Sequence, residues 1–186
     1  MGSTRQKNIL LGVCGGIAAY KSCELVRLLV KEGHDVKVVM TDAAAKFVTA
    51  LTYQTLSNNP VYQDMFELLQ EDSVRHIRLA DWTDICVIAP LSAHTLSKIA
   101  CGICDNLLTT VVCALGERTQ VLMAPAMNRE MWNNPIIREN AAKLKKLKKY
   151  LMLDPGEGGL ACGVYGEGRM PEPEEIAAAI KKIKAA

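Results

Sequence analysis

The sequence has little of what several large classes of protein require. Aromatic residues make up only 5% of its 186 residues, and its formal net charge at pH 7 is only +2. We therefore expect neither an aromatic platform for nucleic-acid bases nor a basic surface for their phosphates. No apolar run approaches the roughly 20 residues of a membrane span, and the first residues lack the apolar stretch of a signal peptide. A nucleic-acid partner and a membrane anchor are both unexpected.

Cysteine is present, but not in the pattern of a secreted, disulfide-bonded protein. The seven cysteines are an odd number, and Cys14, Cys86 and Cys113 lie within apolar runs. This pattern predicts reduced, buried thiols and a cytoplasmic location. Cys101 and Cys104 form a single C-x-x-C pair, whereas a structural zinc site usually needs four ligands. We expect no metal site and interpret this pair as buried structural cysteines.

The order of apolar runs indicates an α/β protein with one domain, residues 1–186. The composition, 49% hydrophobic and 23% charged, is ordinary for a globular chain. Short apolar runs of the kind found in parallel strands alternate with segments of helical periodicity. The strands are expected at 8–14, 35–40, 84–89, 120–124 and 150–153, and the helices at 17–32, 92–101, 106–115, 136–148 and 173–185. This alternation predicts a doubly wound, Rossmann-like (flavodoxin-like) parallel sheet. Ligands of such sheets bind beyond the carboxyl ends of the strands.

One segment departs from this alternation. Residues 154–172 contain six glycines and two prolines, which is too much glycine for a regular helix or strand. A surface linker is one interpretation. The other is a flap over a binding site, because long loops in compact domains are often lids.

Glycines follow the first predicted strand and precede the first predicted helix. Backbone N–H groups at a helix N-terminus bind phosphate, and Gly15 and Gly16 would let it approach closely. The full G-x-G-x-x-G pattern and the P-loop are both absent, so a mononucleotide fits better than a dinucleotide. A simple tight turn explains the glycines nearly as well.

Two polar residues are candidates for chemistry. His76 carries the side chain that most readily transfers protons near neutral pH, although a structural or surface role is more common for a lone histidine. Asn128 follows the predicted strand at 120–124 and could bind a carboxylate or amide through its NH2 group. An asparagine in this position is also a common helix N-cap.

Several segments together resemble the flavin-containing cysteine decarboxylase family, over about residues 7–185. These segments are GVCGGIAAYK at 12–21, HIRL at 76–79, PLSAHTLSK at 90–98, DNLL at 105–108, PAMN at 125–128 with MW at 131–132, and ACG at 161–163 with GRM at 168–170. The resemblance implies a Rossmann-like flavoprotein that binds FMN at a subunit contact. It also implies a homo-oligomer, a trimer or a dodecamer of four trimers.

The resemblance also implies a reaction and the residues that serve it. The reaction is the FMN-dependent decarboxylation of N-(R)-4′-phosphopantothenoyl-L-cysteine to 4′-phosphopantetheine in coenzyme A biosynthesis, through a thioaldehyde and reduction of an enethiolate. His76 would act as the base, Asn128 would hold the substrate carboxylate, and Cys162 on the flap would donate the final proton. The residues implied to surround FMN are Gly15, Gly16, Ile17, Thr41, Phe47, Pro90, Leu91, Ser92, Ala93, His94 and Ala126. The residues implied to bind substrate are Asn128, Ala161 and Met170.

Relatives within this family leave alternatives open. Peptidyl-cysteine decarboxylases stop at the enethiol and do not need the thiol of Cys162, and some regulatory relatives have lost part of the catalytic set. Two residues depart from the family pattern, Cys14 where a threonine or serine is usual and His94 where many members have asparagine. Many bacterial members are fused to a phosphopantothenate–cysteine ligase, so such a ligase is an expected fused or separate partner.

Overall fold

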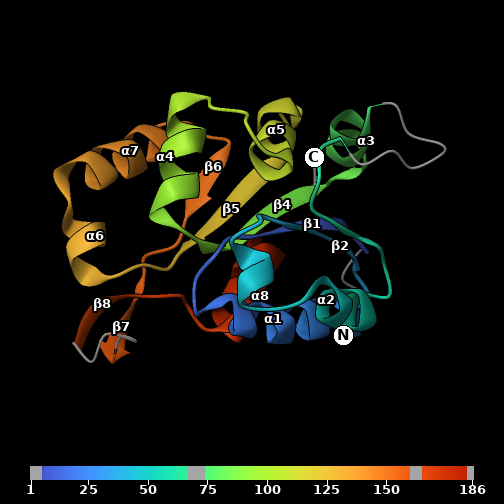
Figure 1. Ribbon diagram of the computed structural model, residues 1–186, viewed down its shortest axis with the longest axis horizontal. Helices are drawn as coiled ribbons and strands as arrows, with labels where there is room; N and C mark the ends of the chain where they lie inside the picture. Colours follow the sequence, from blue (N-terminus) through green and yellow to red (C-terminus); the bar gives the residue numbers. More distant parts are fainter. Residues whose placement is uncertain (1–5, 67–73, 160–164, 184–186) are drawn as a thin grey trace.

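The structure is a computed structural model that describes residues 6–66, 74–159 and 165–183 (Figure 1). The strands of the main sheet are β1 (Asn8–Val13), β2 (Asp35–Met40), β3 (Val61–Tyr62), β4 (Ile85–Leu91), β5 (Gln120–Pro125) and β6 (Tyr150–Met152). The helices are α1 (Ala19–Lys31), α2 (Ala50–Ser57), α3 (Arg75–Trp82), α4 (Ala93–Cys101), α5 (Leu107–Ala114), α6 (Arg129–Asn133), α7 (Pro135–Lys145) and α8 (Pro173–Lys182), with a short 3-10 helix η1 (Ala44–Lys46).

The six strands form one parallel sheet in the order β3-β2-β1-β4-β5-β6. This is the strand order of the doubly wound Rossmann fold. The chain leaves β1 toward β2 on one side and returns through β4 on the other, so the order reverses between β1 and β4. The predicted fold class is confirmed. The reversal point also predicts where a ligand would bind, beyond the carboxyl ends of β1 and β4.

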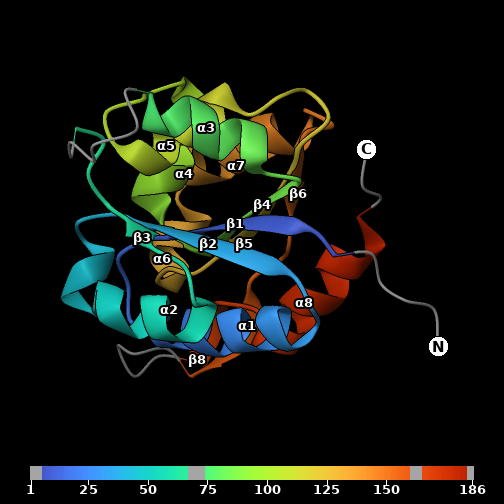
Figure 2. The same ribbon diagram turned by 90° about the vertical axis from the view of Figure 1, so that its right-hand side faces the viewer.

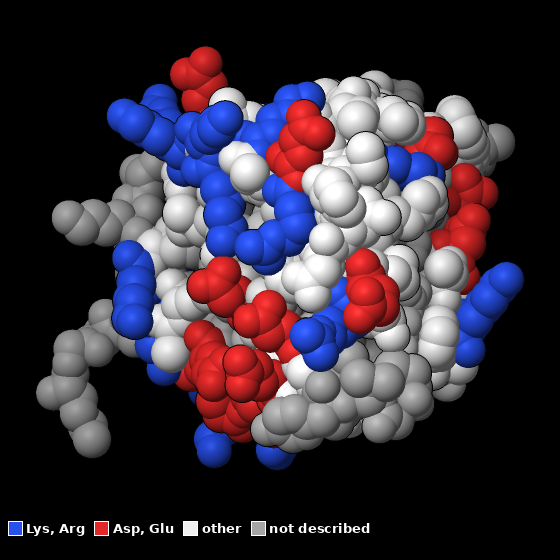
Figure 3. All heavy atoms as spheres, turned by 90° about the vertical axis from the view of Figure 1, so that its left-hand side faces the viewer, with Lys and Arg blue, Asp and Glu red and all other residues white. Residues whose placement is uncertain are grey.

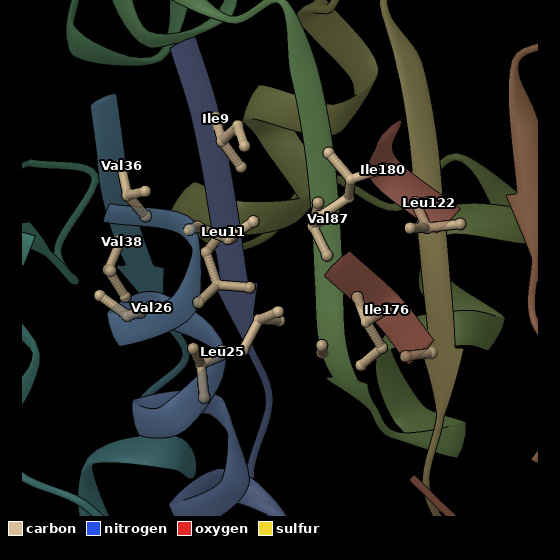
Figure 4. Packing of buried hydrophobic residues seen from close by; sticks show 14 of the residues in the cluster. Ile9, Leu11, Leu25, Val26, Val36, Val38, Val87, Leu122, Ile176 and Ile180 are labelled. Atoms are coloured by element: carbon tan, nitrogen blue, oxygen red, sulfur yellow. The ribbon is translucent and has the colours of Figure 1, made fainter. Parts of the chain in front are cut away.

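Helices cover both faces of the sheet (Figures 1 and 2). Alternate residues of β1 serve opposite faces, because side chains in a strand alternate in direction. Ile9 and Leu11 pack with α1 and α8 in one cluster, where Figure 4 shows Leu25 and Ile176 facing the sheet. Leu10 packs in the opposite cluster, together with α3, α4, α5 and α7. Burial on both faces explains why the strands are continuous apolar runs.

Local capping signals set several helix ends. Gly33 follows α1 with φ +86°, and Gly102 follows α4 with φ +70°, the left-handed conformation that glycine tolerates best. The Ser92 side chain accepts a hydrogen bond from the Thr95 N–H at 3.3 Å and caps the start of α4. The five predicted helices are present within a few residues of their expected bounds. The short helices α2 and α3 were not anticipated.

The glycine-rich segment contains regular structure, so the expectation that it could not is wrong. β7 (Gly156–Gly159) and β8 (Tyr165–Arg169) pair as an antiparallel hairpin. Glycine is tolerated here because Gly158 and Gly168 have φ of +151° and +137°, which other residues rarely adopt. The strands of the hairpin accommodate both glycines.

Only two of the five cysteines that were predicted to be buried are buried in the structure. Cys14 and Cys86 are buried in the sheet, whereas Cys101, Cys104 and Cys113 are exposed. Cys101 is the last residue of α4, and Cys104 lies in the loop that follows. A helix end on the surface exposes side chains that the apolar run alone would bury.

Helix length and surface charge can be described for the outside of the molecule. Among the described residues, no helix combines the length and hydrophobicity needed to cross a membrane. On the face that carries α6, α7 and the hairpin, the largest group of Lys and Arg side chains lies at the upper left and the largest group of Asp and Glu at the lower left, with further charges of both signs elsewhere (Figure 3).

Candidate functional site

A pocket of about 920 Å³ opens at the carboxyl ends of β1, β2, β4 and β5. Its wall combines four turns that follow these strands with the base of the hairpin, namely residues 15–18, 41–43, 92–95, 126–128 and 168–170. The volume lies within the range of small-molecule and cofactor sites. The fold thus brings together five segments that are far apart in the sequence.

The turn between β1 and α1 presents unused hydrogen-bond donors to this pocket. Among the described residues, the backbone N–H groups of Gly15, Gly16, Ile17 and Ala18 have no protein acceptor. Glycine is required at position 15 because the turn after β2 passes close by. A Cβ atom at Gly15 would collide with the backbone of Ala43. A Cβ at Gly16 would meet nothing within 4 Å. These donors and the start of α1 form a cradle for an anion such as a phosphate.

A second helix start faces the same pocket. Ser92 caps α4, and the next residues, Ala93 and His94, line the pocket at the first turn of the helix. Thr41 is held at the end of β2 by its N–H, which donates to the Val13 carbonyl at 3.0 Å, and its side chain accepts from the Ala44 N–H at 3.2 Å. Both helix starts carry partial positive charge, so the pocket favours an anionic ligand.

Asn128 lies at the end of β5 and also lines the pocket. Its side-chain oxygen accepts a hydrogen bond from the Glu130 N–H at 2.8 Å, which caps α6. The N-cap interpretation is therefore confirmed. This contact uses the side-chain oxygen, and the NH2 group is the hydrogen-bond donor of the same amide. The cap and a binding role are compatible in one side chain.

The structure brings most of the expected site residues together. Those that line the pocket are Gly15, Gly16, Ile17, Thr41, Ser92, Ala93, His94, Ala126, Asn128 and Met170. Pro90 and Leu91 are buried in β4 behind the pocket wall, and Phe47 is 52% exposed at the end of η1. Ala161 and Cys162 lie outside the described residues.

His76 is not among the residues that line this pocket. It is half-buried near the start of α3, a helix that packs against α5. Within one copy of the described chain, the expected base is therefore not assembled with Asn128. The role of His76 as the base stays a prediction, and it requires that His76 reach a pocket other than the one in its own copy.

Charged side chains of the pocket were not anticipated from the sequence. Lys98 on α4 donates to both carboxylate oxygens of Asp105, each at 2.7 Å, and this contact lowers the pKa of Asp105. Lys21 on α1 and Arg169 on β8 also line the pocket. Each lysine lies in a helix that begins at the pocket, Lys21 in α1 and Lys98 in α4. Their distance along the helix from the preceding turn is the sequence signal that places them near the pocket.

The Cys14 thiol is close to the pocket but shielded from it. Burial raises the pKa of Cys14, although contacts with Thr95 and Ser92 oppose this shift. Cys14 is fully buried, so it remains a neutral thiol at neutral pH. The phosphate cradle is consequently made by backbone N–H groups, without a hydroxyl at this position.

Comparison with known proteins identifies the family. The model of the family described as Flavoprotein matches residues 2–184. The chain belongs to the Flavoprotein family. This flavoprotein is 43% identical over 178 residues to the "Probable phosphopantothenoylcysteine decarboxylase" of Streptococcus mutans, with 96% of this chain and 97% of that protein covered.

Longer relatives match over part of their length. The flavoprotein is 44% identical over 170 residues to the "Coenzyme A biosynthesis bifunctional protein CoaBC" of Bacillus subtilis, which covers 91% of this chain. The chain spans only 41% of the length of that relative. The CoaBC of Vibrio cholerae is 44% identical over 178 residues, and this chain covers 44% of its length.

Solved structures share the fold closely. A PPC decarboxylase variant in complex with pantothenoylaminoethenethiol has a TM-score of 0.84 and 35% identity, covering 95% of this chain and 97% of that chain. The FMN-binding protein AtHal3 has a TM-score of 0.81 and 36% identity, covering 95% of this chain and 96% of that chain.

The residues of the flavoprotein pocket fit a flavin mononucleotide. One phosphate can be held by the four N–H groups of the turn at 15–18. The space beside that turn stays open because a Cβ at Gly16 would meet no protein atom. The pocket volume of about 920 Å³ leaves room for a flavin and a second small molecule.

Proposed function

We propose that this flavoprotein is an FMN-dependent decarboxylase that converts N-(R)-4′-phosphopantothenoyl-L-cysteine to 4′-phosphopantetheine, in coenzyme A biosynthesis. One observation carries the proposal: Asn128 and the N–H groups of residues 15–18 share a single pocket. A phosphate-bearing cofactor and a carboxylate-bearing substrate can thus be bound side by side. The relative from Streptococcus mutans, similar over its whole length, supports the same activity.

FMN would be held chiefly by the two helix starts. The N–H groups of the turn at Gly15 and Gly16 would bind its phosphate, and Thr41, Ser92 and Ala126 would contact the remainder. When bound, FMN supplies the electron acceptor and donor that a cysteine carboxylate needs before it can lose CO2. The protein supplies orientation and proton transfer.

Asn128 would orient the substrate. Its oxygen is already engaged by the Glu130 N–H at 2.8 Å, so its amide rotation is fixed. The NH2 group would then donate to the carboxylate that leaves as CO2. Because an amide carries no net charge, this contact orients the carboxylate without stabilising it as strongly as a cation would. Loss of CO2 is favoured because the carboxylate is stabilised less by the neutral amide than it would be by a cation.

Two proton-transfer groups complete the proposed reaction. His76 would remove a proton from the cysteine end during its oxidation to a thioaldehyde, because a neutral imidazole nitrogen can accept a proton as a general base. Cys162 would return a proton when the enethiolate is reduced to the thiol. This last step separates a complete reaction to 4′-phosphopantetheine from one that stops at the enethiol.

A homo-oligomer, a trimer or a dodecamer, would place His76 in the pocket of a second copy. Support comes from two features of the described chain. His76 does not line its own pocket. Large apolar side chains beside the pocket are exposed, with Ile17 at 61% and Tyr20 at 59%, as expected of a surface that a partner covers.

The wider setting is proposed from the same relatives. Residues 1–186 would form one flavoprotein domain that acts in the cytoplasm. The bifunctional relatives suggest a phosphopantothenate–cysteine ligase as a fused or separate partner, because this chain spans less than half of their length.

Mass spectrometry of the product tests the proposal. The purified protein is loaded with FMN, which should give a yellow sample, and is incubated with phosphopantothenoylcysteine. We expect loss of the mass of CO2 and formation of 4′-phosphopantetheine. A product lighter by two further hydrogens would indicate the enethiol and a peptidyl-cysteine type of reaction. No turnover by an FMN-loaded protein would refute the decarboxylase assignment.

A further inference from the structure

The cations of the pocket are not neutralised equally. Lys98 is paired one-to-one with Asp105, with both oxygens at 2.7 Å. Lys21 and Arg169, in contrast, share a single oxygen of Glu172, at 2.6 Å and 3.6 Å. Two positive charges at this wall are therefore opposed by one negative charge. The excess positive charge lies between the start of α1 and the base of the hairpin.

Arg169 is positioned but not satisfied. Its guanidinium lies against the backbone of Gly158, where a Cβ would come within 2.6 Å of the guanidinium nitrogen and within 2.8 Å of Cδ. Within residues 6–66, 74–159 and 165–183, it has one charged partner, the Glu172 oxygen at 3.6 Å, and donates no hydrogen bond. The N–H donors of the guanidinium suit the oxygens of a carboxylate or phosphate.

Lys21 on α1 is the second cation of this wall. Its side chain is only 11% exposed, and it lines the pocket from the first turn of α1. A largely buried ammonium gains from a close anion, because the surrounding protein screens charge less than water does. Glu172 provides one such anion but is itself 51% exposed and shared with Arg169.

We propose that Lys21 and Arg169 form a subsite for a phosphate monoester, the 4′-phosphate of the substrate. This assignment rests on the proposed function. The N–H groups at 15–18 account for the phosphate of FMN, and Asn128 accounts for the substrate carboxylate. The remaining anion of the substrate is its phosphate. An arginine and a lysine that share one carboxylate offer a net positive charge and N–H donors to a phosphate.

Other charges of the pocket do not offer the same site. Asp42 lines the pocket at the turn after β2 and would repel an anion there. Lys98 is already engaged by Asp105. The subsite therefore makes the enzyme selective for the phosphorylated substrate through a contact remote from the reacting cysteine.

The test compares two product ligands that both lack the carboxylate. Isothermal titration calorimetry measures binding of 4′-phosphopantetheine and of pantetheine to the FMN-loaded protein. We expect Arg169→Met to lower the affinity for 4′-phosphopantetheine by roughly 10- to 100-fold, because the variant loses charge-assisted hydrogen bonds to the phosphate. Pantetheine affinity and FMN affinity should stay unchanged. Arg169→Lys should restore part of the loss, and Lys21→Met should resemble Arg169→Met.

A matched control separates this contact from the loss of an ordinary surface ion pair. Arg27 pairs with Glu24 at the same i,i+3 spacing, at 2.7 Å, on the exposed side of α1. Arg27→Met should leave both product affinities unchanged. Circular dichroism and FMN content establish that each variant is folded. If Arg169→Met does not fold, Arg169→Lys and Lys21→Met still decide the question.

Three results would overturn the subsite. The first is an equal loss of affinity for 4′-phosphopantetheine and pantetheine. The second is an unchanged affinity for both. The third is a loss of FMN affinity in place of phosphopantetheine affinity, which would assign the two cations to the cofactor phosphate. Turnover of the wild type is measured in parallel. An inactive wild type contradicts the proposed decarboxylation, whereas an active wild type with unaffected variants contradicts the subsite alone.

Discussion

The backbone N–H of Met127 donates to the carbonyl oxygen of Gly168 at 2.9 Å. This bond joins the end of β5, where Asn128 begins the next turn, to the base of the hairpin. Gly168 adopts φ +137°, and a Cβ there would collide with the Met127 carbonyl oxygen. The pocket wall beside Asn128 therefore depends on a glycine at this position.

Gly168→Ala should disturb the hairpin while leaving the flavin site intact. The clash with Met127 and the strained backbone are each expected to cost about 1–3 kcal/mol, most of it relieved by detachment of the hairpin. We expect FMN to stay bound and KM for phosphopantothenoylcysteine to rise. Gly116→Ala is the control, since a Cβ there meets nothing within 4 Å. Equal kinetics for both variants would contradict the role of this contact.

Gly15 and Gly16 should respond differently to alanine. At Gly15 the new Cβ collides with the backbone of Ala43, so Gly15→Ala should lower the stability of the FMN-free protein in urea unfolding. At Gly16 the Cβ meets no protein atom, so Gly16→Ala should leave that stability unchanged. Any loss of FMN affinity in Gly16→Ala then reports contact with the cofactor itself. Equal destabilisation by both substitutions would show that the turn is arranged otherwise.

Mixing two inactive variants tests whether His76 acts on a neighbouring copy. His76→Asn and Asn128→Ala should each be inactive alone. If each pocket takes His76 from a second copy, mixed oligomers formed by refolding together contain pockets with both native residues, about a quarter of the total in an equal mixture. Decarboxylase activity should then reappear. A mixture that remains inactive, although mass spectrometry shows mixed oligomers, would place the base elsewhere.

Cys162→Ser should separate the two halves of the reaction. A serine hydroxyl is a much weaker acid than a thiol, so protonation during the final reduction should slow strongly. In a single turnover with stoichiometric FMN, CO2 should still be released, the two electrons should stay on the flavin, and the enethiol should appear in the mass spectrum. Cys101→Ser serves as the control at an exposed cysteine. Normal formation of 4′-phosphopantetheine by Cys162→Ser would assign the proton to another donor.

His34 should make stability depend on pH. Burial lowers the pKa of His34, and Lys7 and Lys181 lower it further while Glu32 opposes them. The folded state therefore resists protonation of this imidazole, and stability should fall as pH drops through the ordinary histidine range. Urea unfolding at several pH values measures this loss. His34→Gln, which can still accept the hydrogen bond from the Lys7 N–H, should flatten the curve; an unchanged slope would exclude His34 as its source.

Much of the fold could be predicted from the sequence because its signals are local. Apolar runs located five of the six strands of the sheet, and Gly33 located the end of α1. The errors arose where tertiary contacts override local preference. The hairpin at 156–169 forms although its glycines disfavour strands, because Gly168 packs against Met127. Cys113 is exposed although it lies within an apolar run.

The site was predictable in part. The segments at 15–18, 92–94 and 126–128 follow strands of a parallel sheet, and parallel strands end at one edge, so their convergence follows from the fold class. The charged wall was not predictable. Lys21 is 151 residues from Glu172, and although Arg169 lies at i,i+3 spacing from Glu172, no local pattern links that pair to Lys21.

The sequence by itself determined the fold class, the position of the glycine turn after the first strand and the resemblance to flavin-dependent cysteine decarboxylases. These features depend on hydrophobic periodicity and on short motifs, which act over a few residues. Only the tertiary structure decided that Asn128 caps α6 through its oxygen, that His76 stands outside its own pocket, and that Lys21 and Arg169 share one carboxylate. Such relationships depend on how distant segments pack, because charges and hydrogen bonds act across space regardless of separation along the chain.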